Sequence, residues 1–222
     1  MDITQIYTKY KIMPSLQLHM LRVAGVARII CENFKKPELI NTENIVTACL
    51  LHDMGNIIKF DLSLFPQFLE PEGLDYWKVV QDEFINKYGK DEHIATFAIA
   101  TELGVSEQVL ELVKSIGFSN SESNFNTNDF NSKISAYADF RVAPYGVDLL
   151  KNRLEDGRKR FKINKMHTYD FKKDKFEQMV KFIEQIEKQI FEKCNLKPVQ
   201  ITETLVLTKL DELKKLQLYL EL

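Results

Sequence analysis

The segment CLLHDMGNIIKF, residues 49–60, places a histidine next to an aspartate at the end of an apolar run. Both side chains are costly to bury unless a partner satisfies them. A divalent cation is one such partner, because imidazole nitrogens and carboxylate oxygens are common metal ligands. Adjacent helical residues point about 100° apart, so His52 and Asp53 can share one ion only at the edge of their helix. The pair is therefore a candidate half of a metal site, which other helices must complete.

Two further residues could complete it. His19 lies in LQLHMLRVAGVA, in a stretch long enough to form a helix that packs beside the helix of His52. Asp139 lies in ISAYADFRVAP, where small neighbours such as Ser135 and Ala136 allow another helix to approach closely. A single buried histidine is more often a satisfied core residue than a ligand, so each residue alone is weak evidence. In order, the four form the pattern H…HD…D.

Helices must position these residues. Apolar residues at three- and four-residue intervals predict a helix after Pro14 and a second from about Thr42, with Gly55 as its stop. Further helices are predicted over residues 91–103, 106–116 and 133–143, with charged helical sequence over 149–194. Only 8 Gly and 6 Pro in 222 residues favour long helices. The face of the first helix contains Leu16, Met20, Val23, Ala27 and Ile30. The sequence predicts an all-α fold.

Two segments lack this regular pattern. Residues 61–90 mix aromatic residues with Pro66, Pro71 and Gly73 before a helical stretch. They could be a lid over a pocket or a short helix that covers the core. Residues 119–132, SNSESNFNTNDFNS, are rich in Asn and Ser without apolar periodicity, which predicts a loop.

The order H…HD…D, with the local contexts H-x-x-R-V, LLHDMGN and YADFRVAPYGV, resembles the HD-domain superfamily of metal-dependent phosphohydrolases. The resemblance covers roughly residues 15–160. It implies an HD-domain-like helical bundle, which we expect over residues 1–160. The leucine-rich sequence near the end predicts a C-terminal helical extension over residues 161–222, which packs on the core or on a partner subunit in a homodimer. The resemblance also implies that one divalent cation per chain (Mn, Fe, Co, Ni, Zn or Mg) is held by His19, His52, Asp53 and Asp139.

The resemblance further implies hydrolysis of a small-molecule phosphoester, most often a nucleotide, by a metal-activated water. Members that hold two metals use two more histidines. Here His93 matches the first, but Lys114 and Ser115 stand where the second is expected. We therefore expect one metal. The alternative function is a non-catalytic HD-type regulatory or ligand-sensing module, although such versions usually lose ligands and this chain keeps all four.

His93 has several interpretations: it could support a ligand, act as a general acid, contact a phosphate or be a structural histidine at a helix start. Arg22 follows His19 by three residues on the same helix face and is the first candidate for a phosphate contact. The candidate catalytic residues are therefore Asp53, His93 and Arg22. The other cations near the motifs, which are expected to be solvated, are Lys59, Lys114 and Arg141. His167 is expected at the surface.

Composition excludes several classes. Lys and Arg total 30 against 32 Asp and Glu, so the chain lacks the basic excess of a non-specific nucleic-acid binder. The basic stretch 151–165 is expected to be a solvated helix face rather than an RNA contact. An odd count of 3 cysteines without Cys-x-x-Cys spacing argues against a disulfide framework or a cysteine zinc site. Neither a secretory signal nor a transmembrane stretch is recognisable, so we expect a cytoplasmic protein that does not bind membranes.

Overall fold

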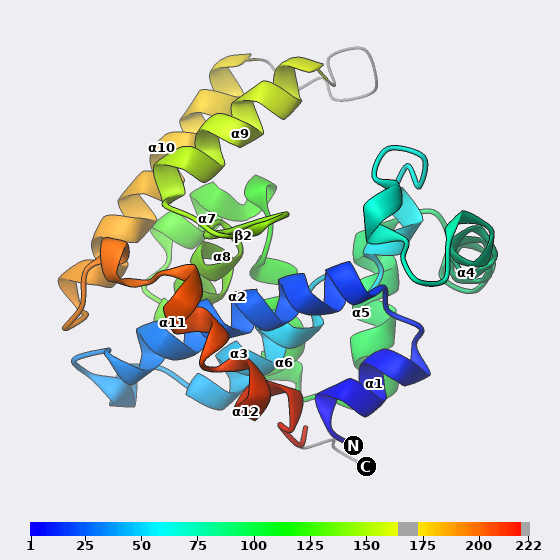
Figure 1. The fold of residues 1–222 in the computed structure, drawn as a ribbon. Helices are drawn as coiled ribbons and strands as arrows, with labels where there is room; N and C mark the ends of the chain where they lie inside the picture. Colours follow the sequence, from blue (N-terminus) through cyan, green and yellow to red (C-terminus); the bar gives the residue numbers. More distant parts are fainter. Residues whose placement is uncertain (164–172, 219–222) are drawn as a thin grey trace.

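The computed structural model describes residues 1–163 and 173–218 of the chain. His167 lies outside the described residues, so its predicted surface position is not addressed by the structure. Within the described part, the sheet structure is a two-stranded antiparallel hairpin, β1 (Val142–Ala143) and β2 (Gly146–Val147). All other regular secondary structure of the described residues is helical, so the all-α prediction is confirmed (Figure 1).

The helices follow one another through short connections (Figure 1). The α-helices are α1 (Ile3–Lys9), α2 (Pro14–Glu32), α3 (Thr42–Leu51), α4 (Leu74–Tyr88), α5 (Glu92–Leu103), α6 (Glu107–Ser115), α7 (Ser121–Asn126), α8 (Phe130–Asp139), α9 (Leu150–Ile163), α10 (Lys173–Glu192), α11 (Glu203–Leu207) and α12 (Leu210–Lys214). Short 3-10 helices are η1 (Pro37–Leu39), η2 (Asn56–Lys59), η3 (Pro66–Phe68), η4 (Phe118–Asn120) and η6 (Pro198–Gln200). No described helix is both long enough and apolar enough to cross a membrane.

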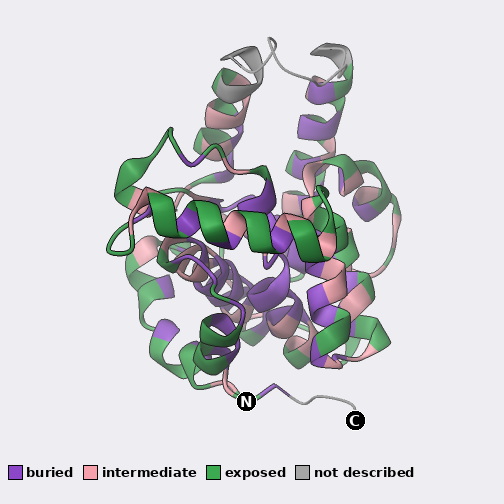
Figure 2. Ribbon diagram, turned by 90° about the vertical axis from the view of Figure 1, so that its right-hand side faces the viewer, coloured by how far each residue is buried: buried purple, intermediate pink, exposed green. Residues whose placement is uncertain are grey.

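Helix α2 lies at the centre of the packing, against α3, α8, α11, α12 and the hairpin. Its predicted apolar face is buried, and one hydrophobic core extends from the N-terminal residues to the last turns. Val206, Leu210 and Leu213 of the C-terminal segment belong to that core. Figure 2 shows the buried residues gathered in the interior, with α9 and α10 projecting as an arm. A domain boundary near residue 160, which falls within α9, and a homodimer both stay predictions.

The prediction of a loop over residues 119–132 is wrong. This segment contains η4, α7 and the start of α8. Its polar side chains bond locally to the backbone: the Ser121 hydroxyl donates to the Phe118 carbonyl, and the Asn124 amide donates to the Ser115 carbonyl. Asn and Ser therefore serve here as caps and helix-terminal residues, and such a role leaves no apolar periodicity in the sequence.

Helices α3 and α8 are held together where they begin. The Asn41 side chain accepts a hydrogen bond from the Asn44 amide at the start of α3, and Asp129 accepts from the Asn131 and Ser132 amides at the start of α8. The Asn131 side chain joins the two caps, because it donates to Asp129 Oδ1 and accepts from the Asn41 amide, both at 2.6 Å. Both helices have 10 residues, so their C-terminal ends also lie side by side.

Arg141 is fully buried, which corrects the expectation of a solvated cation. Its guanidinium donates to the Tyr137 hydroxyl and to the carbonyls of Asp148, Pro198 and Ile201. These acceptors come from the hairpin region and from the C-terminal segment, and they satisfy a charge that would otherwise be costly to bury. Arg141 therefore fastens the end of α8 to residues some 60 positions further along the chain.

We predict that Asp129→Ala lowers the free energy of unfolding at pH 7 by about 1–2 kcal/mol, because α8 loses its cap. Burial alone would raise the pKa of Asp129, but hydrogen bonds from Ser132 and Asn131 outweigh it and lower the pKa below the ordinary value. This contribution is therefore present above about pH 4 and lost as the pH falls through the folded-state pKa. Urea unfolding of both proteins at neutral and acidic pH measures the difference. The exposed Asp211→Ala is the control, and an effect that persists in acid contradicts the prediction.

We also predict that Gly55→Ala destabilises the protein by about 1–3 kcal/mol. Helix α3 ends at Leu51, so the predicted stop at Gly55 is four residues too late, and the φ of −94° at Gly55 suits any residue. Space is the constraint instead, since a Cβ here would lie 2.5 Å from the Glu92 carbonyl oxygen. Gly157→Ala is the matched control: its Cβ would make only ordinary contact with Phe176, so it should stabilise α9 by about 0.5–1 kcal/mol. Thermal unfolding of the two variants should therefore shift in opposite directions.

Candidate metal centre

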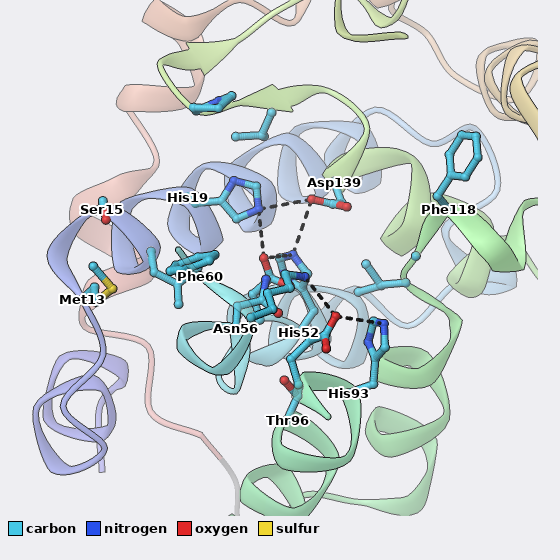
Figure 3. Close-up of a pocket in the computed structure, with 18 of the residues that line it drawn as sticks. Met13, Ser15, His19, His52, Asn56, Phe60, His93, Thr96, Phe118 and Asp139 are labelled. Carbon is cyan, nitrogen blue, oxygen red and sulfur yellow. Dashed lines mark ion pairs between the residues drawn. The ribbon is translucent and has the colours of Figure 1, made fainter. Parts of the chain in front are cut away.

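The four predicted ligands lie near one another, and Figure 3 shows His19, His52 and Asp139 side by side. His19 comes from α2, His52 directly follows α3, Asp53 is next to it, and Asp139 is the last residue of α8. Asp139 Oδ1 lies 3.2 Å from His19 Nε2 and 3.5 Å from His52 Nε2. Asp53 Oδ2 lies 3.5 Å and 3.6 Å from the same two nitrogens. His19, His52 and Asp53 thus form a group whose ligand atoms lie close enough together to hold one ion, and Asp139 contacts both histidines beside it.

The hydrogen bonding of His52 fixes which of its nitrogens faces Asp53 and Asp139. Nδ1 lies 2.8 Å from the Cys49 carbonyl oxygen. A carbonyl oxygen only accepts, so Nδ1 donates this bond and Nε2 is the nitrogen that faces the carboxylates. The side chain is only 2% exposed, and Nε2 has no hydrogen-bond partner. A buried nitrogen without a partner requires an explanation. A cation between Nε2 and the carboxylates would satisfy it, with the Cys49 carbonyl orienting the ring as is usual for metal-bound histidine.

The electrostatics of the metal-free cluster point the same way. Burial would lower the pKa of His52, but the neighbouring carboxylates of Asp53 and Asp139 outweigh it and raise the pKa to about 9. Burial would raise the pKa of Asp139, but His19 and His52 hold it well below its usual range. Without a metal, a proton on His52 therefore balances the acidic pair. The same charge balance favours a cation in its place.

The backbone at this corner is held by other buried groups. The Tyr7 hydroxyl donates to the Leu50 carbonyl at 2.7 Å, in the last turn of α3. The Gly55 amide donates to the Thr96 hydroxyl of α5 at 2.9 Å. Carbonyls at a helix C-terminus have no partner within the helix, so these bonds satisfy groups that the turn would otherwise leave open. The turn that carries His52 and Asp53 is therefore fixed from two sides.

A cavity of about 940 Å³ opens above the cluster, large enough for a small molecule. One wall is apolar and comes from the segment 62–69. The opposite wall includes Val113, Ile116, Phe118 and Phe176, and Asn56 and Thr96 contribute polar groups. The predicted lid-like segment thus lines the cavity through its first part, and α4 packs behind it.

His93 lines this cavity with its side chain 73% exposed, and its Nε2 lies 3.6 Å from Glu92 Oε1. The same Glu92 oxygen lies 3.3 Å from Lys59 Nζ, so the carboxylate lies between the Lys59 ammonium and the His93 ring. Sequence reasoning missed Glu92. Its only signal was its place beside His93 in the first turn of a helix, where acidic residues are common for reasons of helix stability.

The structure does not bring Arg22 to the cluster. Its guanidinium donates to Glu203 Oε1 from Nε at 2.9 Å and from Nη2 at 2.6 Å, and Arg22 is not among the residues that line the cavity. Two cations that do line it are Lys114, which is bound to Glu111, and Arg153, which donates to the Val142 carbonyl. Arg153 was not singled out in the sequence, because it lies in a stretch dense in charged residues.

A comparison with protein families supports the same three residues, His19, His52 and Asp53. The family model described as "HD domain" matches residues 17–121, a span that includes His19, His52 and Asp53 and ends before Asp139. No curated protein and no solved structure matches the chain. The matched segment supplies three of the four converging side chains, and α8 brings the fourth. The family assignment therefore rests on residues 17–121, which match the HD domain.

Proposed function

We propose that this protein is a metal-dependent phosphohydrolase that cleaves a phosphoester of a small molecule, with nucleotides as the first substrates to test. One observation carries the proposal: the buried, unpartnered Nε2 of His52 faces His19 and two carboxylates at the base of an open cavity. The Asp139 and Asp53 oxygens lie 3.5 and 3.6 Å from this nitrogen, too far for a good hydrogen bond, and a cation between them would satisfy all three groups. The superfamily, whose members are mostly metal-dependent hydrolases, supports the same reaction class.

His19, His52, Asp53 and Asp139 would hold the cation. Two imidazoles and two carboxylates suit Mn, Fe, Co, Ni or Zn, and Mg less well. Within residues 1–163 and 173–218, one cluster of three or more potential ligands is present, at His19, His52 and Asp53, which supports one ion per chain. When bound, such a cation polarises the phosphoryl group and lowers the pKa of water.

The chain's own residues would do the remaining work. His93 is exposed to the cavity, and histidine suits a proton donor to the leaving oxygen because its ordinary pKa is near neutrality. Glu92, held by Lys59, can orient the His93 ring through Nε2. Lys114 and Arg153 line the cavity and are better placed than Arg22 to attract a phosphate. A phosphate contact by Arg22 stays a prediction, and it requires the ion pair with Glu203 to open.

We predict that the purified protein binds one divalent ion per chain. Asp139→Asn and Asp53→Ala should each weaken this binding and lower kcat/KM by more than about 100-fold, since even groups that only support ligands cost 10–100-fold. Metal analysis and assays on a panel of phosphoesters with added Mn²⁺ measure both effects. Asp61→Asn is the matched control, because Asp61 lines the same cavity but bonds to Ser63.

The outcomes separate the two functions left open by the sequence. Activity that survives Asp53→Ala excludes catalysis by this centre. A folded wild-type protein that takes up no metal and cleaves nothing in the panel supports the non-catalytic ligand-sensing module instead.

We further predict that His93→Ala lowers kcat by about 10²–10⁴-fold for alkyl phosphates, whose leaving oxygen needs a proton. The loss should be much smaller for p-nitrophenyl phosphate, because its phenolate leaves without protonation. Metal content should stay unchanged. Ile94→Ala, at an exposed neighbour in α5, is the control. Equal losses for the two leaving groups would exclude His93 as the acid.

A further inference from the structure

Two aromatic residues that line the cavity continue into a third that lies just outside its lining. Phe65 and Phe68 line it from the η3 segment, and Tyr145 stands on the turn of the β1–β2 hairpin. The ring centroids of Phe65 and Phe68 are 5.6 Å apart, and those of Phe68 and Tyr145 are 5.8 Å apart. Phe65 is 50% exposed and Tyr145 72% exposed. Exposed rings that lie next to one another beside a polar centre indicate a binding surface rather than core packing.

The η3 side of this aromatic cluster is fixed from behind. The indole of Trp77, in α4, donates to the Leu69 carbonyl at 2.9 Å. The Gln81 amide, one turn later, donates to the carbonyls of Ile57 and Phe60 at 2.7 Å and 2.9 Å. Both ends of the segment that carries Phe65 and Phe68 are therefore tied to α4, while both residues line the cavity.

The hairpin side is fixed by the ion pair of Arg22. Glu203 Oε1 accepts from Arg22, and Glu203 Oε2 accepts from the Val147 amide at 2.7 Å. Gly146 has φ of 150°, and a Cβ there would lie 3.0 Å from the same carboxylate. Glu203 therefore ties the hairpin to α2, one turn from His19. The hairpin tip, with Tyr145, is thus positioned relative to the metal centre by a short chain of bonds.

The separation of the rings defines what fits between them. A planar ring inserted between two others needs roughly 7 Å between the outer centroids, which is twice the carbon–carbon contact distance of about 3.5 Å. Phe68 and Tyr145 are about 1 Å closer than this and their planes are inclined by 43°, so a ring does not insert between them. A ring can instead stack on the exposed face of Tyr145.

We propose that Phe65, Phe68 and Tyr145 form a stacking subsite for the leaving group, which binds an aromatic ring of the ester while its phosphate lies at the metal centre. The proposal rests on the proposed function and extends it to substrate selection. Apart from the Tyr145 hydroxyl, the three side chains offer no hydrogen bonds, so the subsite distinguishes planar apolar groups from compact polar ones and is tolerant of ring identity. Aryl and nucleoside phosphates fit it, and small sugar phosphates do not.

Two phosphonates that cannot be hydrolysed test the subsite. Methylphosphonate and phenylphosphonate share the phosphate-like group and differ in the ring. Calorimetric titration into the Mn²⁺-loaded protein should give phenylphosphonate an affinity about 10-fold higher, in line with the stacking of one ring. Phe68→Ala and Tyr145→Ala should reduce that ratio towards one and leave methylphosphonate binding unchanged. Tyr145→Phe, which keeps the ring, should retain the ratio, as should Val79→Ala at an exposed site outside the cavity.

Each result decides one part of the proposal. Equal binding of the two phosphonates by the wild-type protein, or a phenyl preference that survives both alanine variants, overturns the aromatic subsite. Phenylphosphonate binding without methylphosphonate binding refutes phosphate recognition at the metal and keeps the subsite if the alanine variants lose it. Binding of neither phosphonate overturns both. Tyr145 is an exposed turn residue, so its variants test the subsite without a risk to the core.

Discussion

The hydrogen bond from the Asn41 backbone to the Asn131 side chain sets where two helices begin relative to each other. Because α3 and α8 have equal length, that starting point also determines where they end. One residue more in either helix would turn its last side chain by about 100° and shift it by about 1.5 Å. His52 would then no longer face Asp139. Helix α2 needs only to pack beside this pair to add His19, so the geometry of the centre depends on a polar contact at the far end of both helices.

The chemistry of the centre also follows from these helix ends. The C-terminal ends of α3 and α8 both meet at the cluster, and a helix C-terminus carries a partial negative charge. Together with the Asp53 and Asp139 carboxylates, they create a site that needs positive charge. The metal-free chain supplies it as a proton on His52, whose pKa is raised to about 9. A divalent cation carries more charge and also satisfies the unpartnered Nε2. The fold thus selects for a cation before any substrate is present.

The sequence predicted the features that local patterns encode. Apolar periodicity gave the helices, and the order of His19, His52, Asp53 and Asp139 gave the cluster, because ligands must follow helices that pack together. Long-range polar contacts left no local signal. The partner of Arg22 stands 181 residues away, and the carbonyls around Arg141 come mostly from the distant C-terminal segment. The Asn/Ser-rich segment was wrongly predicted as a loop because its helices lack apolar periodicity. Local hydrogen bonds from its polar side chains stabilise these helices instead.

The buried guanidinium of Arg141 has a consequence for how the molecule opens. Arg141 stands two residues after Asp139 and binds carbonyls on both sides of residue 200. If the C-terminal segment detached, the guanidinium would lose two of its four acceptors, which also hold the end of α8 in place. Opening of the tail and loosening of the last ligand are therefore coupled rather than independent fluctuations. In hydrogen-exchange terms they form one cooperative unit, and ion binding would protect amides in a segment that contributes no ligand.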